Sequence, residues 1–161
     1  MEKNVLFISE KTIKDTGLLD ENLSNSYIRP VLKYVQDESM SRILGQEFYE
    51  DIQKKIEDSD VSSEYEILLN FYIKDVLLWY VMAEIQIPLS AKFRNMGMTV
   101  GSDEQVNNLF INEIKYTKNQ YRLKATFYEN RLNKFLFDNA KEYPLFKKCR
   151  NNRYNTQIYL D

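Results

Sequence analysis

The feature that most constrains the fold is the stretch between Gly101 and Pro144, which contains neither glycine nor proline. Ser102 is a suitable N-cap, so the stretch predicts one helix from Asp103 to about Asn139, roughly 55 Å long at 1.5 Å per residue. Such a helix exceeds the diameter of a small domain, so part of it is expected to have neighbours beyond this chain. Apolar or small residues recur along it every three or four positions: Val106, Phe110, Ile114, Thr117, Tyr121, Ala125, Tyr128, Leu132 and Phe135.

A second apolar line runs along the same predicted helix, formed by Leu109, Tyr116, Leu123 and Phe127. One apolar stripe is enough to pack a helix onto a bundle. The second stripe is either buried within the chain as well or contacts another protein. The spacing alone does not decide between these two interpretations.

The rest of the chain is also helical in pattern. Ser63 and Glu66 have the form of a capping box, and the helix that follows is apolar nearly all round, as expected for the centre of a bundle. Pro88 is expected to end it, and the pattern breaks in the segment 91–101. Gly17, Gly45 and Pro144 mark other helix ends. The predicted helices before the long one are Glu10 to Thr16, Leu23 to Leu44 with Pro30 inside, Phe48 to Ile56, and Ser63 to about Ile87.

These patterns predict an all-α fold, a helical bundle with one long C-terminal helix and a small β-hairpin or extended loop near 91–101. The 161 residues fit one domain, which we place at 1–146, followed by a C-terminal tail at 147–161. The tail ends in alternating apolar residues, Ile158 and Leu160. It is expected either to be disordered or to add as a strand to another subunit.

Composition removes most catalytic chemistry. The chain has no histidine and one cysteine, Cys149, which excludes histidine acid–base catalysis, cysteine–histidine nucleophiles and an internal disulfide. Its glycines are isolated, so there is no phosphate-binding loop. Most acidic residues fall on polar helix faces, and only Glu84 lies deep in an apolar helix. It is expected either to pair with a Lys or Arg from another helix or to mark where its helix meets a neighbour, because burying it unpaired is costly. We therefore expect no enzyme activity, no catalytic residues, no metal site and no cofactor.

Charge is distributed unevenly along the chain. Residues 1–70 carry eight Lys or Arg against fifteen Asp or Glu, and residues 71–161 carry fourteen against nine. This polarity suits head-to-tail packing of identical subunits or a nearby polyanion, but ordinary solvated helix faces explain it equally well. The basic and aromatic run 115–153 suggests nucleic-acid binding, although Tyr121 and Tyr128 belong to the predicted core stripe. No apolar segment is long enough to predict a membrane span.

Several short motifs resemble the head–tail connector (adaptor) proteins of tailed bacteriophages, possibly the ring proteins of crAss-like phages. The N-terminal half carries FISEKTIKDTGL and then YIRPVLKYVQDESMSRILGQEFYEDI. The second half carries an apolar helix, Asn95–Met96–Gly97, and a long helix followed by Tyr143–Pro144. The order of these elements spans about residues 6 to 146. Met96 departs from the pattern, since a lysine is expected there, and the tail has no clear counterpart.

The resemblance implies a structural virion protein, made in the host bacterial cytoplasm and located at the head–tail junction. Proteins of this kind form a homo-oligomeric ring, commonly a dodecamer, beneath the portal protein, where they extend the DNA channel and join head to tail. The implied partners are the portal, adjacent connector or tail proteins, and packaged DNA through non-specific proximity, with no membrane. The residues expected to contact partners are Phe93, Asn95, Met96 and Met98 in the projecting segment, and Tyr154, Ile158, Tyr159 and Leu160 in the tail.

Two other functions fit the same residues. The chain is alternatively a helical adaptor that binds a single protein partner in a groove, or a helical nucleic-acid-binding protein acting through residues 115–153. The first predicts a monomer or dimer with an exposed apolar cleft. The second predicts salt-sensitive affinity for DNA.

Overall fold

The computed structural model describes residues 5–95 and 104–146, and side-chain surroundings for 5–90 and 111–146. Within these residues every regular element is helical and there is no strand, so the chain is all-α. The elements are α1 (Glu10–Lys14), α2 (Asn25–Val35), the π-helical turn η1 (Gln36–Met40), α3 (Ser41–Leu44), α4 (Gln46–Glu57), α5 (Ser63–Leu68), the π-helical turn η2 (Leu69–Ile73), α6 (Lys74–Glu84), α7 (Gln86–Asn95) and α8 (Glu104–Asp138).

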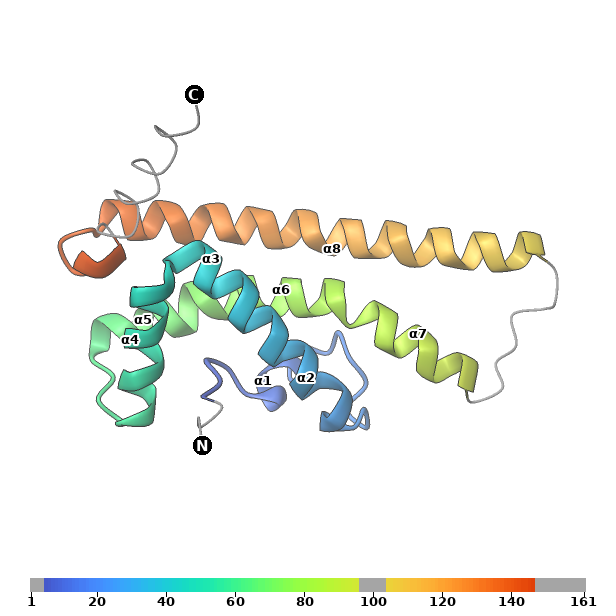
Figure 1. Ribbon diagram of the computed structural model, residues 1–161, viewed down its shortest axis with the longest axis horizontal. Helices are drawn as coiled ribbons and strands as arrows, with labels where there is room; N and C mark the ends of the chain where they lie inside the picture. Colours follow the sequence, from blue (N-terminus) through green and yellow to red (C-terminus); the bar gives the residue numbers. More distant parts are fainter. Residues whose placement is uncertain (1–4, 96–103, 147–161) are drawn as a thin grey trace, which may run out of the picture.

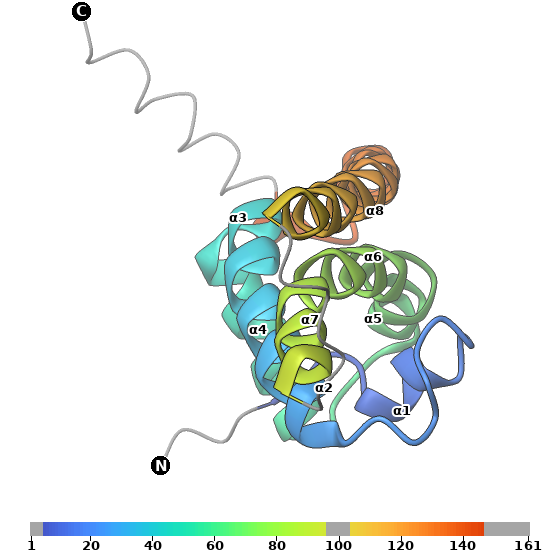
Figure 2. The ribbon, with the colours of Figure 1, turned by 90° about the vertical axis from the view of Figure 1, so that its right-hand side faces the viewer.

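The helices pack around α6, which lies in the middle of the molecule (Figure 1). Along one edge, α8 packs against α6, and α2, α3 and α4 cover another side (Figure 2). Six of the eleven residues of α6 are buried, in agreement with a sequence that is apolar nearly all round. They are Val76, Leu77, Leu78, Val81, Met82 and Ala83. This central position anchors α8, whose faces carry the candidate site.

Local signals fix the N-terminal elements largely as the sequence predicts. The Ser9 side chain accepts a hydrogen bond from the backbone N–H of Thr12 and so caps α1. Gly17 and Gly45 have φ angles of 71° and 86°, a region that favours glycine, and they follow α1 and α3. Pro30 does not end α2. It is the sixth of the eleven residues of that helix, and its missing N–H removes the hydrogen bond to the carbonyl of Ser26.

The amide of Gln36 ties the N-terminal segment to the bundle. Its oxygen accepts a hydrogen bond from the backbone N–H of Phe7 at 2.6 Å, and its nitrogen donates to the carbonyl of Val5 at 2.9 Å and to the Tyr49 hydroxyl at 3.3 Å. The residue is fully buried, and these contacts satisfy it. Tyr49 in turn donates to Asp37 at 2.6 Å, so η1 lies at the centre of a polar cluster.

Two local predictions in the middle of the chain are wrong. The N-cap of α5 is Ser62, and the N–H of Glu66 donates to the Ser62 carbonyl, so Ser63 and Glu66 form no capping box. Pro88 does not end a helix. Instead, α6 ends at Glu84 and Pro88 lies in the first turn of α7, where its missing N–H has no intrahelical partner to lose.

The hairpin or extended loop predicted near 91–101 is wrong for its first part. Helix α7 continues to Asn95, so residues 91–95 are helical. The physical reason is that Pro88 initiates this helix rather than ending the previous one, which shifts the break towards the C-terminus. Residues 96–101 of the predicted segment, and the whole tail 147–161, lie outside the described residues.

Candidate protein–protein interface on helix α8

The inner face of α8 is held by apolar packing. Ala125, Leu132 and Leu136 are fully buried, and Leu132 and Leu136 belong to the hydrophobic core that α6 also lines. Their spacings of seven and four residues place them on one side of the helix. The opposite side of α8 therefore points away from the bundle.

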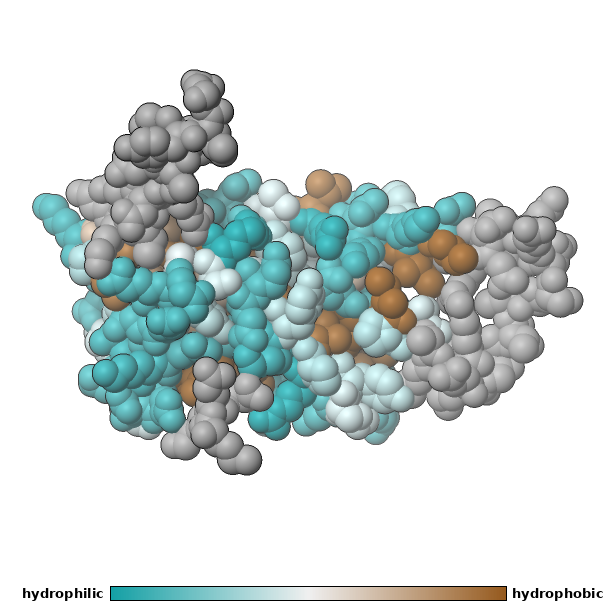
Figure 3. Space-filling model, viewed as in Figure 1, coloured by the Kyte–Doolittle hydropathy of each residue, from teal (hydrophilic) through white to brown (hydrophobic). Residues whose placement is uncertain are grey.

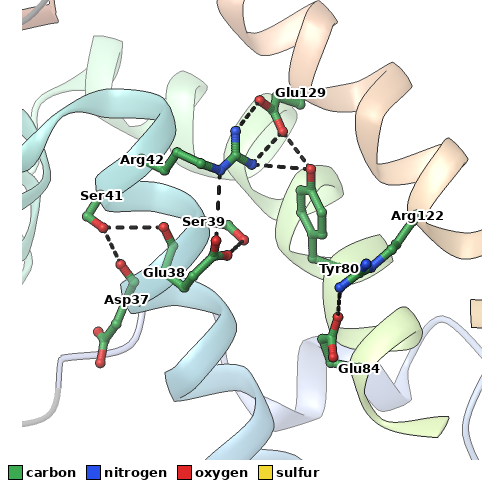
Figure 4. Close-up of polar contacts among 9 residues, drawn as sticks. All are labelled: Asp37, Glu38, Ser39, Ser41, Arg42, Tyr80, Glu84, Arg122 and Glu129. Atoms are coloured by element: carbon green, nitrogen blue, oxygen red, sulfur yellow. Dashed lines mark hydrogen bonds and ion pairs between the residues drawn. The ribbon is translucent and has the colours of Figure 1, made fainter. Parts of the chain in front are cut away.

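A polar cluster fixes α8 on the side that faces α2 and α3 (Figure 4). Arg42 at the start of α3 donates to both carboxylate oxygens of Glu129, at 2.7 and 2.8 Å, in the paired geometry that suits a guanidinium. The hydroxyl of Tyr80 on α6 donates to the same carboxylate at 2.6 Å. Burial alone raises the pKa of Glu129, but the hydrogen bonds from Arg42 and Tyr80 outweigh it, so this pKa lies below its ordinary value.

Glu84, at the end of α6, makes the second polar attachment of α8. Lys118 donates to one of its carboxylate oxygens at 2.8 Å and Arg122 to the other at 2.7 Å. This confirms that the acid in the apolar helix has basic partners from another helix. Burial opposes its ionisation, but the two hydrogen bonds prevail and lower the pKa of Glu84.

A third acid, Asp75, behaves differently. Its carboxylate lies 3.5 Å from the guanidinium of Arg131. Burial dominates here, and the nearby charges of Arg131 and Lys74 reduce its effect without reversing it, so the pKa of Asp75 is raised. Two of the three attachments, at Glu84 and Asp75, join basic residues of α8 to acids of α6. They account for part of the uneven charge distribution, whereas in the Arg42–Glu129 pair the acid lies on α8.

A pocket of about 260 Å³ lies between α2, α6 and α8 beside these ion pairs. Its lining includes Glu38, Arg42, Glu84 and Arg122, whose charges are of both signs and engage one another or Glu129. A site of this kind positions helices rather than a substrate. Among the residues that the structure describes, no group of His, Cys, Asp or Glu is arranged to hold a metal ion.

On the other side, aromatic rings line the contact of α8 with α6 and η2. We call them the aromatic seam: Tyr72, Trp79, Tyr121, Tyr128 and Phe135. Tyr72 stacks on Phe135 with ring centroids 3.9 Å apart, and Trp79 stacks on Tyr121 at 5.8 Å. Two cations cover it. Arg131 lies 5.1 Å from the centroid of Tyr72, and Lys124 lies 4.5 Å from that of Trp79. The seam explains why these aromatic residues are poor platforms for stacking nucleic-acid bases.

The outer face of α8 carries exposed apolar residues. Tyr116, Leu123 and Phe127 are 67%, 65% and 65% exposed, so these three members of the second apolar line are not buried within the described chain. The fourth member, Leu109, lies outside the described side chains. Figure 3 shows hydrophobic surface interrupting the hydrophilic surface along α8. Exposed apolar side chains that share one helix face are typical of a surface that another protein covers. We call Tyr116, Leu123 and Phe127 the outer face of α8.

The residues predicted from sequence to contact partners lie mostly outside what the structure describes. Phe93 and Asn95 belong to the last part of α7, and their side-chain surroundings are not described. Met96, Met98, Tyr154, Ile158, Tyr159 and Leu160 fall outside the described residues, so the expectation for all eight stays a prediction. The cluster of Arg42, Tyr80 and Glu129 was missed by sequence reasoning. Its members are far apart in the sequence, and no local signal pairs them.

No helix among the described residues is long and apolar enough to cross a membrane. The described residues form an all-α bundle with an exposed apolar face on α8. The chain matches a family of unknown function, DUF6712, over residues 40–156. Because this match covers more than half of the chain, the protein belongs to that family. No curated protein and no solved structure matches it.

Proposed function

We propose that the protein is a head–tail connector subunit of a tailed bacteriophage, which assembles into a ring beneath the portal protein, extends the DNA channel and joins head to tail. The observation that carries the proposal is the exposed outer face of α8, because a ring subunit needs apolar surface that its own fold leaves uncovered. The phage assignment itself rests on the sequence resemblance. In this proposal the protein acts as a structural component of the virion and not as an enzyme.

The fold contributes one further support. Helix α8 has 35 residues, about 52 Å at 1.5 Å per residue, and provides a long straight edge for lateral packing. The chain beyond α7, including Met96 and Met98, is proposed to project as an extended loop towards an adjoining ring. The tail 147–161, with Tyr154, Ile158, Tyr159 and Leu160, is proposed to contact a neighbouring subunit or tail protein.

A dedicated nucleic-acid-binding role has less support. Lys118, Arg122 and Arg131 are paired with carboxylates of the same chain. Cations that already have anionic partners gain less from a phosphate backbone. The single-partner adaptor relies on the same outer face of α8, so the stoichiometry of the complex distinguishes it from the ring.

The test is the mass of the protein in solution, measured by light scattering over a concentration series, with and without the portal protein of the same phage. We expect a ring-sized species, either alone or after portal addition. Phe127→Glu should abolish it, because it places a charge on the outer face of α8. Leu18→Glu, at an exposed residue of the loop after α1, is the matched control and should assemble like the wild type.

A protein that stays monomeric at all concentrations and does not respond to the portal would overturn the ring proposal. A complex of one copy with one partner would support the adaptor instead. Circular dichroism of both variants checks that the helical content is unchanged, so that a loss of assembly reports on the surface and not on folding.

A further inference from the structure

Two surfaces of opposite character lie on opposite edges of the molecule. Helix α8 runs along the upper edge in Figures 1 and 2, and the turn between α4 and α5 lies at the lower edge in both. The acidic turn, residues 57–61, carries three exposed carboxylates, on Glu57, Asp58 and Asp60. A ring needs two different surfaces placed in this way, because a contact between unlike faces passes from copy to copy until the ring closes.

The outer face of α8 is flanked by positive charge. Its exposed cations include Lys115 and Lys134, and Lys134 continues the line of Tyr116 and Leu123 along the helix. Lys124 is also exposed, but its ammonium lies over Trp79 in the aromatic seam. The other basic residues of this described stretch are Lys118, Arg122 and Arg131, which pair with Glu84 and Asp75 inside the chain. The outer face thus combines apolar area with lysines, which suits a partner surface that combines apolar groups with carboxylates.

The acidic turn has this composition. Ile56 and Val61, on either side of the carboxylates, are only partly buried and pack at the margin of the core. Ser59 adopts a φ of 56°, and the N–H of Asp60 donates to the Lys55 carbonyl at 2.9 Å, so the backbone folds back and presents the acids outward. Apolar area and charge therefore match between the two edges.

We infer that adjacent copies join through these two surfaces: the outer face of α8 in one copy receives the acidic turn of the next. Leu123 and Phe127 cover Ile56 and Val61, while Lys134 approaches Asp58 and Asp60. The inference rests on the proposed ring and names its contact. It predicts a heterologous interface, in which α8 never contacts α8 of another copy.

The experiment uses two variants of the full chain, each with one damaged surface. In Leu123→Asp/Phe127→Asp the α8 surface is lost, and in Asp58→Lys/Asp60→Lys the turn is lost. Each variant alone should stay monomeric under conditions in which the wild type assembles. Mixed together, they should form a one-to-one dimer and nothing larger, because only one intact pair of surfaces remains.

Asp15→Lys/Glu21→Lys makes the same charge change at exposed residues elsewhere and should assemble like the wild type. The inference is overturned if the turn variant assembles normally, as contact between two α8 helices would predict, or if the mixed variants fail to dimerise. In both cases the ring proposal still stands if the wild type forms a ring-sized species. If the wild type itself neither assembles nor binds the portal, the ring proposal and this contact fail together.

Discussion

The inner and outer faces of α8 have similar amino acids and opposite surroundings. Leu132 on the inner face is fully buried, whereas Leu123 on the outer face is 65% exposed. The inner face is also fixed by ion pairs to α3 and α6, whereas the apolar side chains of the outer face are exposed. An apolar stripe on a helix therefore indicates contact with another surface. It does not say whether that surface belongs to the same chain or to another protein, because this depends on how the helix is rotated against its neighbours.

The strongest test of this comparison makes the same substitution on both faces. Leu132→Ala should lower the free energy of unfolding by about 2–5 kcal/mol, because it leaves a cavity in the core. Leu123→Ala should change it by less than about 0.5 kcal/mol, because the side chain is exposed in the free subunit. Urea unfolding of monomeric protein, followed by circular dichroism, measures both.

Equal destabilisation of the two variants would contradict this comparison, since it would mean that the outer face packs against the same chain. The comparison is supported further if Leu123→Ala leaves the free energy of unfolding unchanged but weakens assembly. This second result would separate the surface that holds α8 in place from the surface that binds another protein.

An intermediate effect is expected from the polar cluster. Glu129→Gln removes the charge that Arg42 and Tyr80 hold and should lower the free energy of unfolding by about 1–3 kcal/mol. Glu113→Gln, at an exposed acid of the same helix, is the control and should have almost no effect. Thermal unfolding of the two variants, side by side, measures the difference. Equal melting temperatures would show that the cluster does not hold α8.

The smallest effect is a pH dependence. The pKa values of Glu84 and Glu129 are lowered in the folded protein from an ordinary value of 4.5, so their stabilisation is present above about pH 4.5 and is lost as the pH falls through the folded values. We expect a loss on the order of 1 kcal/mol for each. Asp75 acts in the opposite direction, because its pKa is raised and its protonation favours the folded state.

Melting temperatures between about pH 6 and about pH 3 check this prediction. The double variant Glu84→Gln/Glu129→Gln should start less stable and lose less on acidification than the wild type. A decline as steep as that of the wild type would assign the acid sensitivity to other carboxylates.

The all-α class and most helix ends follow from local signals in the sequence. Ser9, Gly17 and Gly45 act within a few residues of themselves, so their caps and turns are predictable. For Glu84 the sequence left two possibilities, a contact with a neighbour or pairing with a lysine or arginine, and the structure shows this second kind of partner. Its identity depends on how α8 slides along α6, which no local pattern encodes.

The errors have the same physical origin. A proline can either end the helix before it or lie in the first turn of the helix after it, and the sequence around Pro88 does not distinguish these two cases. The choice between Ser62 and Ser63 as the cap of α5 depends on a shift of one residue. Arg42 looks like an ordinary surface residue of an acidic half, and only the packed fold brings it to Glu129.

The two π-helical turns indicate where members of the family can differ in length by one residue. Each holds one more residue per turn than the α-helix around it, and each lies within a helical run, at Gln36–Met40 and at Leu69–Ile73. Loss of one residue there restores an ordinary helix without displacing the elements before it. Genes of relatives that differ by a single codon at these two places should therefore still encode the same bundle, whereas the same deletion in α6 would rotate its buried face out of the core.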